Sequence, residues 1–111
     1  MDDEDEVVEL LTYGLGLAGF KVVVAPDGGS AVQVAQRCKP DVVLLDVSLP
    51  DVDGFSLLSE LRAVTSSPVI FLTARSRNAD RKQGLSLGAA DYVTKPFEMD
   101  DLVKRVQRAL V

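Results

Sequence analysis

Three polar side chains follow apolar runs of the sequence, and their types suit the binding and transfer of a phosphoryl group. Asp46 ends the run DVVLLD, Thr73 ends PVIFLT, and Lys95 follows DYVT directly before Pro96. An aspartate can attack phosphorus, while a hydroxyl and an ammonium can each bind a phosphoryl oxygen. Taken singly, each residue also has an ordinary structural role as a helix cap, a strand end or a surface lysine. Their joint placement after three consecutive apolar runs favours a functional site.

The acidic start of the chain, MDDEDE, would add carboxylates to this site if it enters the same crevice. At an effective dielectric constant of about 20, two unit charges some 5 Å apart repel by roughly 3 kcal/mol, so several acids need a counter-ion. A divalent cation held by oxygen atoms alone is typically Mg²⁺ rather than zinc or copper. The alternative is a solvated cap, because the dipole of a first helix would favour these acids. The residues alone leave both interpretations open.

Short apolar runs alternate with segments of helical spacing, and this alternation predicts an α/β fold. The runs at residues 21–25, 41–46, 68–73 and 91–94 are continuously apolar, which is typical of parallel strands covered on both faces. The stripes with helical spacing are Val7, Leu10, Leu11 and Leu15; Ala31, Val34 and Ala35; Phe55, Leu58 and Leu61; and Leu102, Val103, Val106 and Leu110. Ligands of such sheets bind outside the carboxyl ends of the strands, where the three polar residues are expected to meet.

Composition excludes several classes of function. The 111 residues suit one domain, residues 1–111, and a net charge of −5 argues against a nucleic-acid-binding surface. No apolar run approaches the ~20 residues of a membrane span and no signal peptide is recognisable, so a cytoplasmic location is expected. Without histidine, Ser/His/Asp triads and imidazole metal sites are excluded. Cys38, the single cysteine, is expected to be a small buried residue.

The segments MDDE, DVVLLDVSLPDVDGF, PVIFLTA and GAADYVTKPF, in this order and spacing, resemble the receiver domains of two-component response regulators. The resemblance covers residues 2–111 and implies a flavodoxin-like (CheY-like), doubly wound parallel sheet of nominal order 2-1-3-4-5. It implies a regulatory domain rather than an enzyme, in which Asp46 accepts a phosphoryl group from the phosphohistidine of a sensor kinase. The implied ligands of Mg²⁺ are Asp2, Asp3, Asp46 and the backbone carbonyl of Ser48.

The same resemblance assigns roles to the other polar residues of the predicted site. Thr73 and Tyr92 would form a switch pair, with Tyr92 turning inward when Thr73 moves toward the phosphate. Lys95 would bind the phosphate, and a cis peptide bond is implied before Pro96.

The ending GLSLGAADYVTKPFEMDDLVKRVQRAL resembles the OmpR/PhoB type, whose active receivers form homodimers through the last two helices and the last strand. Matching positions imply that Arg81 faces Asp101, and Asp91 faces Arg105, across a two-fold axis. Ala90 stands where an acid is usual, so one pair of the pattern is expected to be missing.

The first strand of the family pattern is not found in this sequence, because Met1 stands where that strand would end. The strands at 21–25 and 41–46 would then expose unpaired edges toward a gap. A truncation or different start, a strand from another molecule and a rearranged sheet would each explain this, and the first is favoured. Asp2 and Asp3 would lie at a chain terminus, where order is usually low.

Two other functions compete with the phosphoacceptor hypothesis. One is a phosphatase of the haloacid-dehalogenase type, but such enzymes resemble one another in a second acid where this chain has Ser48. The other is a receiver-fold interaction module that has lost phosphorylation. The sequence ends at Val111, close after the last predicted helix, so no output domain is expected within it.

Overall fold

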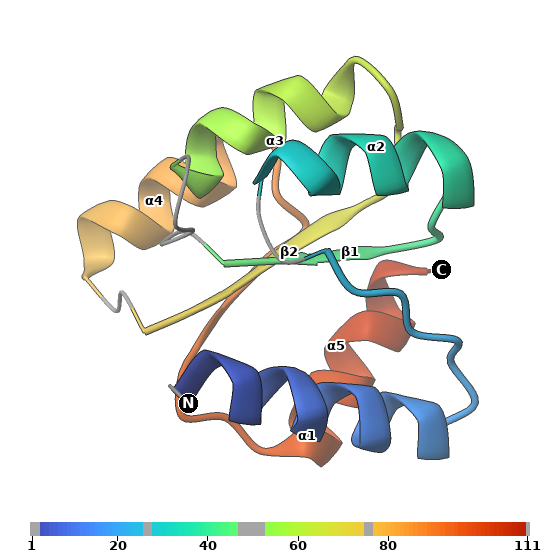
Figure 1. The fold of residues 1–111 in the computed structure, drawn as a ribbon. Coiled ribbons are helices and arrows are strands. Elements are labelled where there is room, and N and C mark those ends of the chain that lie inside the picture. The colour runs from blue at the N-terminus through green and yellow to red at the C-terminus, as the bar shows by residue number, and fades with distance from the viewer. Residues whose placement is uncertain (1–2, 26–27, 47–52, 75–76, 111) are drawn as a thin grey trace.

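The computed structural model describes residues 3–25, 28–46, 53–74 and 77–110, with the backbone alone described for residues 3–7. Within these ranges, three parallel strands form one sheet and five helices cover it (Figure 1). The helices are α1 (Asp3–Leu17), α2 (Gly28–Cys38), α3 (Gly54–Arg62), α4 (Asn78–Ser86) and α5 (Met99–Ala109). The strands are β1 (Val43–Leu45), β2 (Val69–Thr73) and β3 (Asp91–Thr94).

The central strand, β2, is buried along its whole length because it has a parallel neighbour on each side and helices on both faces. Leu45 of β1 pairs with Phe71, and Thr94 of β3 pairs with Thr73. The carboxyl ends of all three strands therefore lie at one edge of the sheet, as the sequence predicts.

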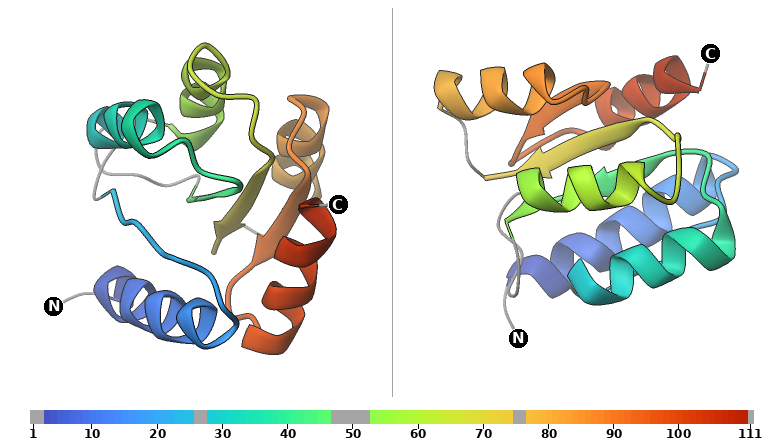
Figure 2. Two further views of the ribbon diagram at one scale, coloured as in Figure 1. Left: turned by 90° about the vertical axis from the view of Figure 1, so that its right-hand side faces the viewer. Right: turned by 90° about the horizontal axis from the view of Figure 1, so that it is seen from above.

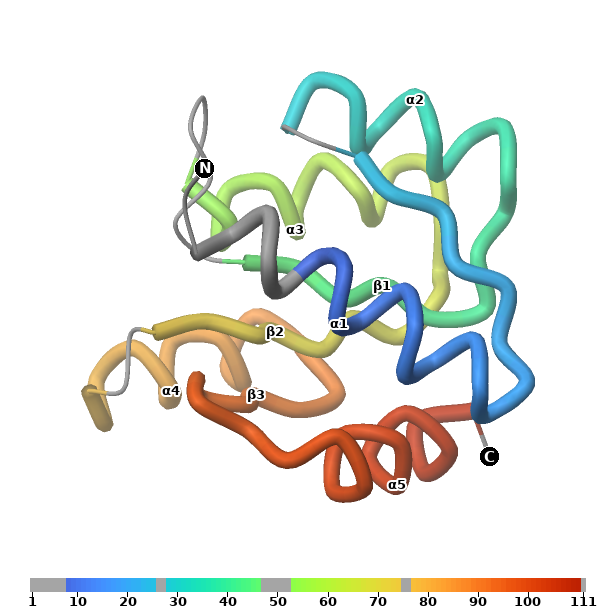
Figure 3. The backbone as a smooth tube through the Cα atoms, turned by 60° about the horizontal axis from the view of Figure 1, so that its bottom comes forward, coloured from blue at the N-terminus to red at the C-terminus, as the bar shows by residue number. Residues whose placement is uncertain are grey.

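Side chains alternate between the two faces of the sheet and build two core clusters. Val69 and Phe71 face the side of α2 and α3, while Ile70 and Leu72 face the side of α1 and α5. Figure 2 shows the helices in two layers with the sheet between them, and Figure 3 shows α1 beside α5. The prediction of a doubly wound sheet with helices on both faces is confirmed.

Three aromatic rings pack against one another in the core cluster on the side of α2 and α3. The rings of Phe55 and Phe71 meet edge to face with their centroids 5.2 Å apart, and the ring of Tyr92 lies 5.9 Å from that of Phe71. These rings come from α3, β2 and β3 and join elements that are distant in the sequence. Such pairs contribute about 0.5–1.5 kcal/mol beyond the burial of their apolar area.

The segment 21–25, predicted as a strand, is not a strand in the structure, and this prediction was wrong. The predicted order places another strand between this segment and β1, and none of the described residues forms that strand. A strand is defined by hydrogen bonds to a neighbour, so an apolar sequence without one stays irregular. Val23 and Val24 are accordingly about half exposed, at 51% and 47%.

Three residues expected inside the core lie at the surface. Leu10 is exposed, whereas Leu15, five residues later and so on a different side of α1, is buried. Cys38 is exposed because it ends α2, one turn beyond the inward-facing Ala35. Leu110 follows the last turn of α5 and is 41% exposed. Within the described ranges, no helix combines the length and the apolar character that crossing a bilayer requires.

Candidate functional site

Asp46 and Lys95 meet at the carboxyl edge of the sheet. Asp46 directly follows β1 and Lys95 directly follows β3, and the distance from Lys95 Nζ to Asp46 Oδ2 is 3.0 Å. Because β2 lies between these two strands, the lysine side chain reaches across the end of the central strand. Both side chains are only 19% exposed, so each charge is partly withdrawn from water and stabilises the other.

Thr73 lies between the two charged residues in the order of the sheet. It is the last residue of β2 and is 1% exposed. The backbone N–H of Lys95 donates to the carbonyl oxygen of Thr73 over 2.8 Å, which ties the end of β3 to the end of β2. The structure therefore places all three predicted residues at one edge, and it confirms the cis bond predicted before Pro96.

The predicted metal ligands fall mostly outside the described residues. Asp2 and Ser48 lie outside them, and for Asp3 the backbone, but not the side chain, is described as the first residue of α1. Among the residues that were described, no group of three or more histidine, cysteine, aspartate or glutamate side chains is arranged to hold a metal ion. Asp46 is thus the one predicted ligand whose side chain is placed, and the complete ligand set stays a prediction.

The ring of Tyr92 is fully buried, with 0% of the residue exposed. It packs against the ring of Phe71, and the guanidinium carbon of Arg81 lies 5.6 Å from its centroid. A guanidinium at this distance is attracted by the negative face of the ring. Tyr92 lies two positions before Thr94, the residue that pairs with Thr73, so the two predicted switch residues occupy neighbouring strands.

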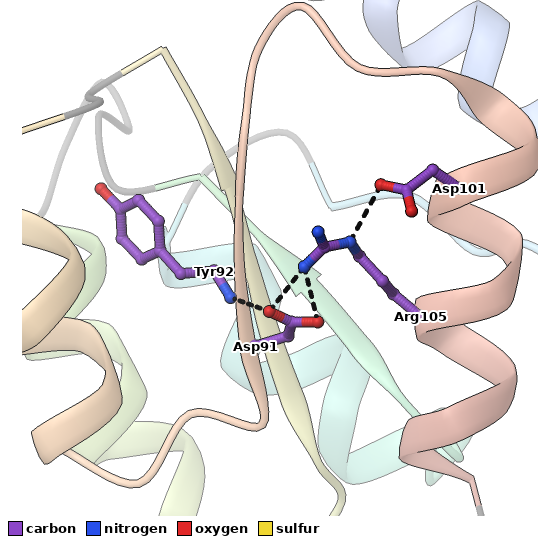
Figure 4. Close-up of polar contacts among 4 residues, drawn as sticks. All are labelled: Asp91, Tyr92, Asp101 and Arg105. Carbon is purple, nitrogen blue, oxygen red and sulfur yellow. Dashed lines mark hydrogen bonds and ion pairs between the residues drawn. The ribbon is translucent and has the colours of Figure 1, made fainter.

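Arg105 of α5 joins two acidic residues that the family resemblance assigns to a dimer face. Its Nη1 donates to both carboxylate oxygens of Asp91, over 2.8 and 2.9 Å, and its Nε donates to Asp101 over 3.0 Å (Figure 4). The hydrogen bond to Asp101 is the main cause that raises the pKa of Arg105; the bond to Asp91 and both negative charges add to it, and burial opposes it. Arg105 is therefore charged at any working pH.

The network of Arg105 reaches the backbone of Tyr92. Oδ1 of Asp91 accepts a hydrogen bond from the N–H of Tyr92 over 2.8 Å as well as from Arg105 (Figure 4). Sequence reasoning missed these contacts within one chain, although the four-residue spacing of Asp101 and Arg105 on a helix is a known signal for such a pair. The pairing of these residues across a two-fold axis concerns two copies of the chain and stays a prediction.

We expect the replacement Arg105→Gln to lower the free energy of unfolding by about 1 kcal/mol or less, because the paired groups are partly exposed. The loss should shrink in about 1 M salt, where the Debye length falls to ~3 Å. Urea unfolding at low and high salt measures both effects. The control is Arg108→Gln on the exposed face of the same helix. An equal, salt-independent loss in both variants would contradict a specific role of this network.

Comparison with known proteins identifies the family of this arrangement. Residues 1–107 match the family described as the response regulator receiver domain. The regulatory protein VanRc of Enterococcus gallinarum is 46% identical over 110 residues, covering 99% of this chain and 48% of that protein. The transcriptional regulatory protein KdpE of Mycobacterium tuberculosis is 42% identical over 110 residues, covering 99% of this chain and 49% of that protein.

A solved structure agrees with these sequence matches. The BeF3-activated N-terminal receiver domain of Klebsiella pneumoniae RstA is similar with a TM-score of 0.91 at 37% identity, covering 98% of this chain and 93% of that one. The present chain spans about half the length of the curated relatives it matches. From the family match, the identities and the shared fold, the chain belongs to the receiver domains of two-component response regulators.

Proposed function

We propose that the chain is a phosphoacceptor: Asp46 takes a phosphoryl group from a phosphohistidine of a sensor kinase. The observation that carries the proposal is the 3.0 Å contact between Lys95 Nζ and Asp46 Oδ2 at the carboxyl edge of the sheet. The pair provides a carboxylate nucleophile and, beside it, an ammonium group that can stabilise negative charge on the phosphoryl oxygens.

The transfer exchanges one bond of phosphorus for another. A carboxylate oxygen of Asp46 forms a bond to phosphorus, the bond from phosphorus to the imidazole nitrogen breaks, and the electron pair stays on that nitrogen. Lys95 then pairs with a phosphoryl oxygen in place of the carboxylate. The hydroxyl of Thr73, at the end of the intervening strand, donates to another phosphoryl oxygen. In this way the modification is sensed by the segments that follow β2 and β3.

The proposed cofactor is Mg²⁺, held by Asp46 together with Asp2, Asp3 and the carbonyl of Ser48. When bound, it neutralises part of the negative charge that the phosphoryl group brings to the acidic site. This ligand set rests on the family resemblance and on the acidic composition of the N-terminal segment.

We further propose that phosphorylation changes self-association through the face made of α4, β3 and α5. The pairs would be Arg81 with Asp101 and Asp91 with Arg105 of the second copy. The names of the relatives describe regulatory proteins, so a role in transcriptional regulation in the cytoplasm is the proposed context. On this proposal DNA contacts are not made by this acidic segment, whose net charge is −5.

The test is the intact mass of the chain after incubation with a small phosphodonor and Mg²⁺. We expect the gain of one phosphoryl group, located at Asp46 by peptide mapping after reduction of the acyl phosphate with borohydride. No gain of mass from the small donor or from a phosphorylated kinase domain would refute the proposal and leave an interaction module. Continuous hydrolysis of a phosphomonoester by the chain would instead favour the phosphatase alternative.

A further inference from the structure

Gly84, a buried glycine of α4, faces the aromatic rings of the core. A Cβ atom added at Gly84 would lie 3.0 Å from Cδ2 of Tyr92 and 3.1 and 3.2 Å from two ring carbons of Phe71. Nonbonded carbon atoms normally approach to about 3.5–4.0 Å. A Cβ atom at position 84 therefore requires the rings to give way by a few tenths of an ångström, and a larger side chain requires more.

This glycine is explained by packing rather than by backbone conformation. Gly84 lies inside α4 with ordinary helical backbone, where alanine would be the more stable choice in an isolated helix. Gly19 and Gly88, in contrast, have positive φ angles of 97° and 99° and lie outside the helices. The use of glycine inside a helix thus has a local reason, the close approach of the rings.

Of the two rings, that of Tyr92 has the freer path of displacement. Phe71 belongs to the central strand, which has a neighbouring strand on each side, and its ring packs edge to face on Phe55. These contacts leave the ring little room to move. Tyr92 belongs to the edge strand β3, and it lines a surface groove of about 400 Å³ together with Arg81, Phe97 and Arg105. This groove is the space into which we expect a ring displaced from Gly84 to move.

We propose that Gly84 is a positioning residue for Tyr92: the missing side chain at position 84 admits the ring to its buried position. Side chains larger than glycine shift the ring toward the groove between α4 and α5, where solvent reaches it. Arg81, placed over the ring, holds the same buried position from the outside. A role of the buried Tyr92 ring in signalling rests on the proposed switch function of Tyr92. The effect of Gly84 on the place of the ring does not depend on that function.

Acrylamide quenching of tyrosine fluorescence tests this inference. The chain has two tyrosines and no tryptophan, and Tyr13 is 69% exposed, so Tyr13→Phe leaves Tyr92 as the single fluorophore. In this background Tyr92 is expected to be nearly inaccessible to acrylamide. Gly84→Ala, which requires a shift of only a few tenths of an ångström, should raise the quenching constant slightly. Gly84→Val should raise it severalfold, toward the value of a free tyrosine derivative, while the far-ultraviolet circular dichroism stays unchanged.

The matched control is Gly16 of α1, where an added Cβ meets nothing within 4 Å. Gly16→Val carries the same change of residue type in a helix and should leave the quenching constant at its parent value. A folded Gly84→Val chain with the quenching constant of the parent would overturn the proposal, as would an equal rise in Gly16→Val.

If Gly84→Val does not fold, a double-mutant cycle of unfolding free energies tests the same proposal. Gly84→Ala is compared by urea unfolding in the Tyr92 and Tyr92→Val backgrounds. The cost of alanine should be smaller in the Tyr92→Val background, because only the ring of Phe71 then lies close to the added Cβ atom. An unchanged cost would show that Phe71 alone resists the side chain, and the proposal would be wrong. Neither experiment uses a phosphodonor, so failure of this inference and failure of phosphoryl transfer to Asp46 are separate results.

Discussion

Replacing Asp46 by asparagine is expected to abolish the uptake of a phosphoryl group. The amide has nearly the same shape as the carboxylate, but it lacks the negative charge and the nucleophilic oxygen that attack on phosphorus requires. Intact mass after incubation with a small phosphodonor and Mg²⁺ should therefore show no added group in Asp46→Asn and one in the parent chain.

The control for this variant is Asp100→Asn, which removes an exposed carboxylate from the first turn of α5. It should accept the phosphoryl group as the parent does. Asp46→Asn should also remain folded, with a loss of about 1 kcal/mol in the free energy of unfolding, because Lys95 loses a charged hydrogen-bond partner. A full gain of mass in Asp46→Asn would identify a different acceptor, and unchanged stability would show that the contact with Lys95 contributes little.

The site could be predicted from the sequence because parallel strands end at a common edge. Asp46, Thr73 and Lys95 are separated by many residues, yet each follows an apolar run, and the structure places them together. The chemistry could not be completed in the same way. The acidic residues Asp2 and Asp3 precede the first helix stripe and have no strand of their own, so nothing in the pattern of strands fixes their place.

The local sequence pattern fails to predict the secondary structure correctly in two segments of the fold. The segment at 21–25 has the composition of a strand, but strand formation depends on a neighbour, which composition does not reveal. Helix α4 is the opposite case: its sequence NADRKQGLS has no apolar stripe, and its buried residues are Asp80 and Gly84. Its presence follows from the alternation of strands and helices rather than from its own periodicity.

Contacts between distant elements were the least predictable feature. The approach of Gly84 to Phe71, and of Arg105 to Asp91, depends on how α4 and α5 lie against the sheet. A single sequence gives the spacing within a helix, and so could indicate the pair of Asp101 and Arg105, but it does not give the distance between a helix and a strand.

Replacing Phe71 by alanine is expected to lower the free energy of unfolding by about 3–5 kcal/mol. Phe71 is 0% exposed, lies on the central strand, and contacts the rings of both Phe55 and Tyr92. The variant loses the transfer free energy of the ring and leaves a cavity that the flanking strands β1 and β3 prevent from closing. A domain of this size is typically stable by about 5–15 kcal/mol, so urea unfolding should show a large shift of the midpoint.

The control is Leu87→Ala, which truncates a side chain that is 43% exposed just beyond α4. This substitution should lower the free energy of unfolding by only about 0.5 kcal/mol, as is usual at the surface. Phe71→Leu should fall between the two, because leucine refills part of the space. Equal costs for Phe71→Ala and Leu87→Ala would contradict the central place of Phe71. If they differ as expected, the ring that packs against Tyr92 is also one of the main sources of the stability of the domain.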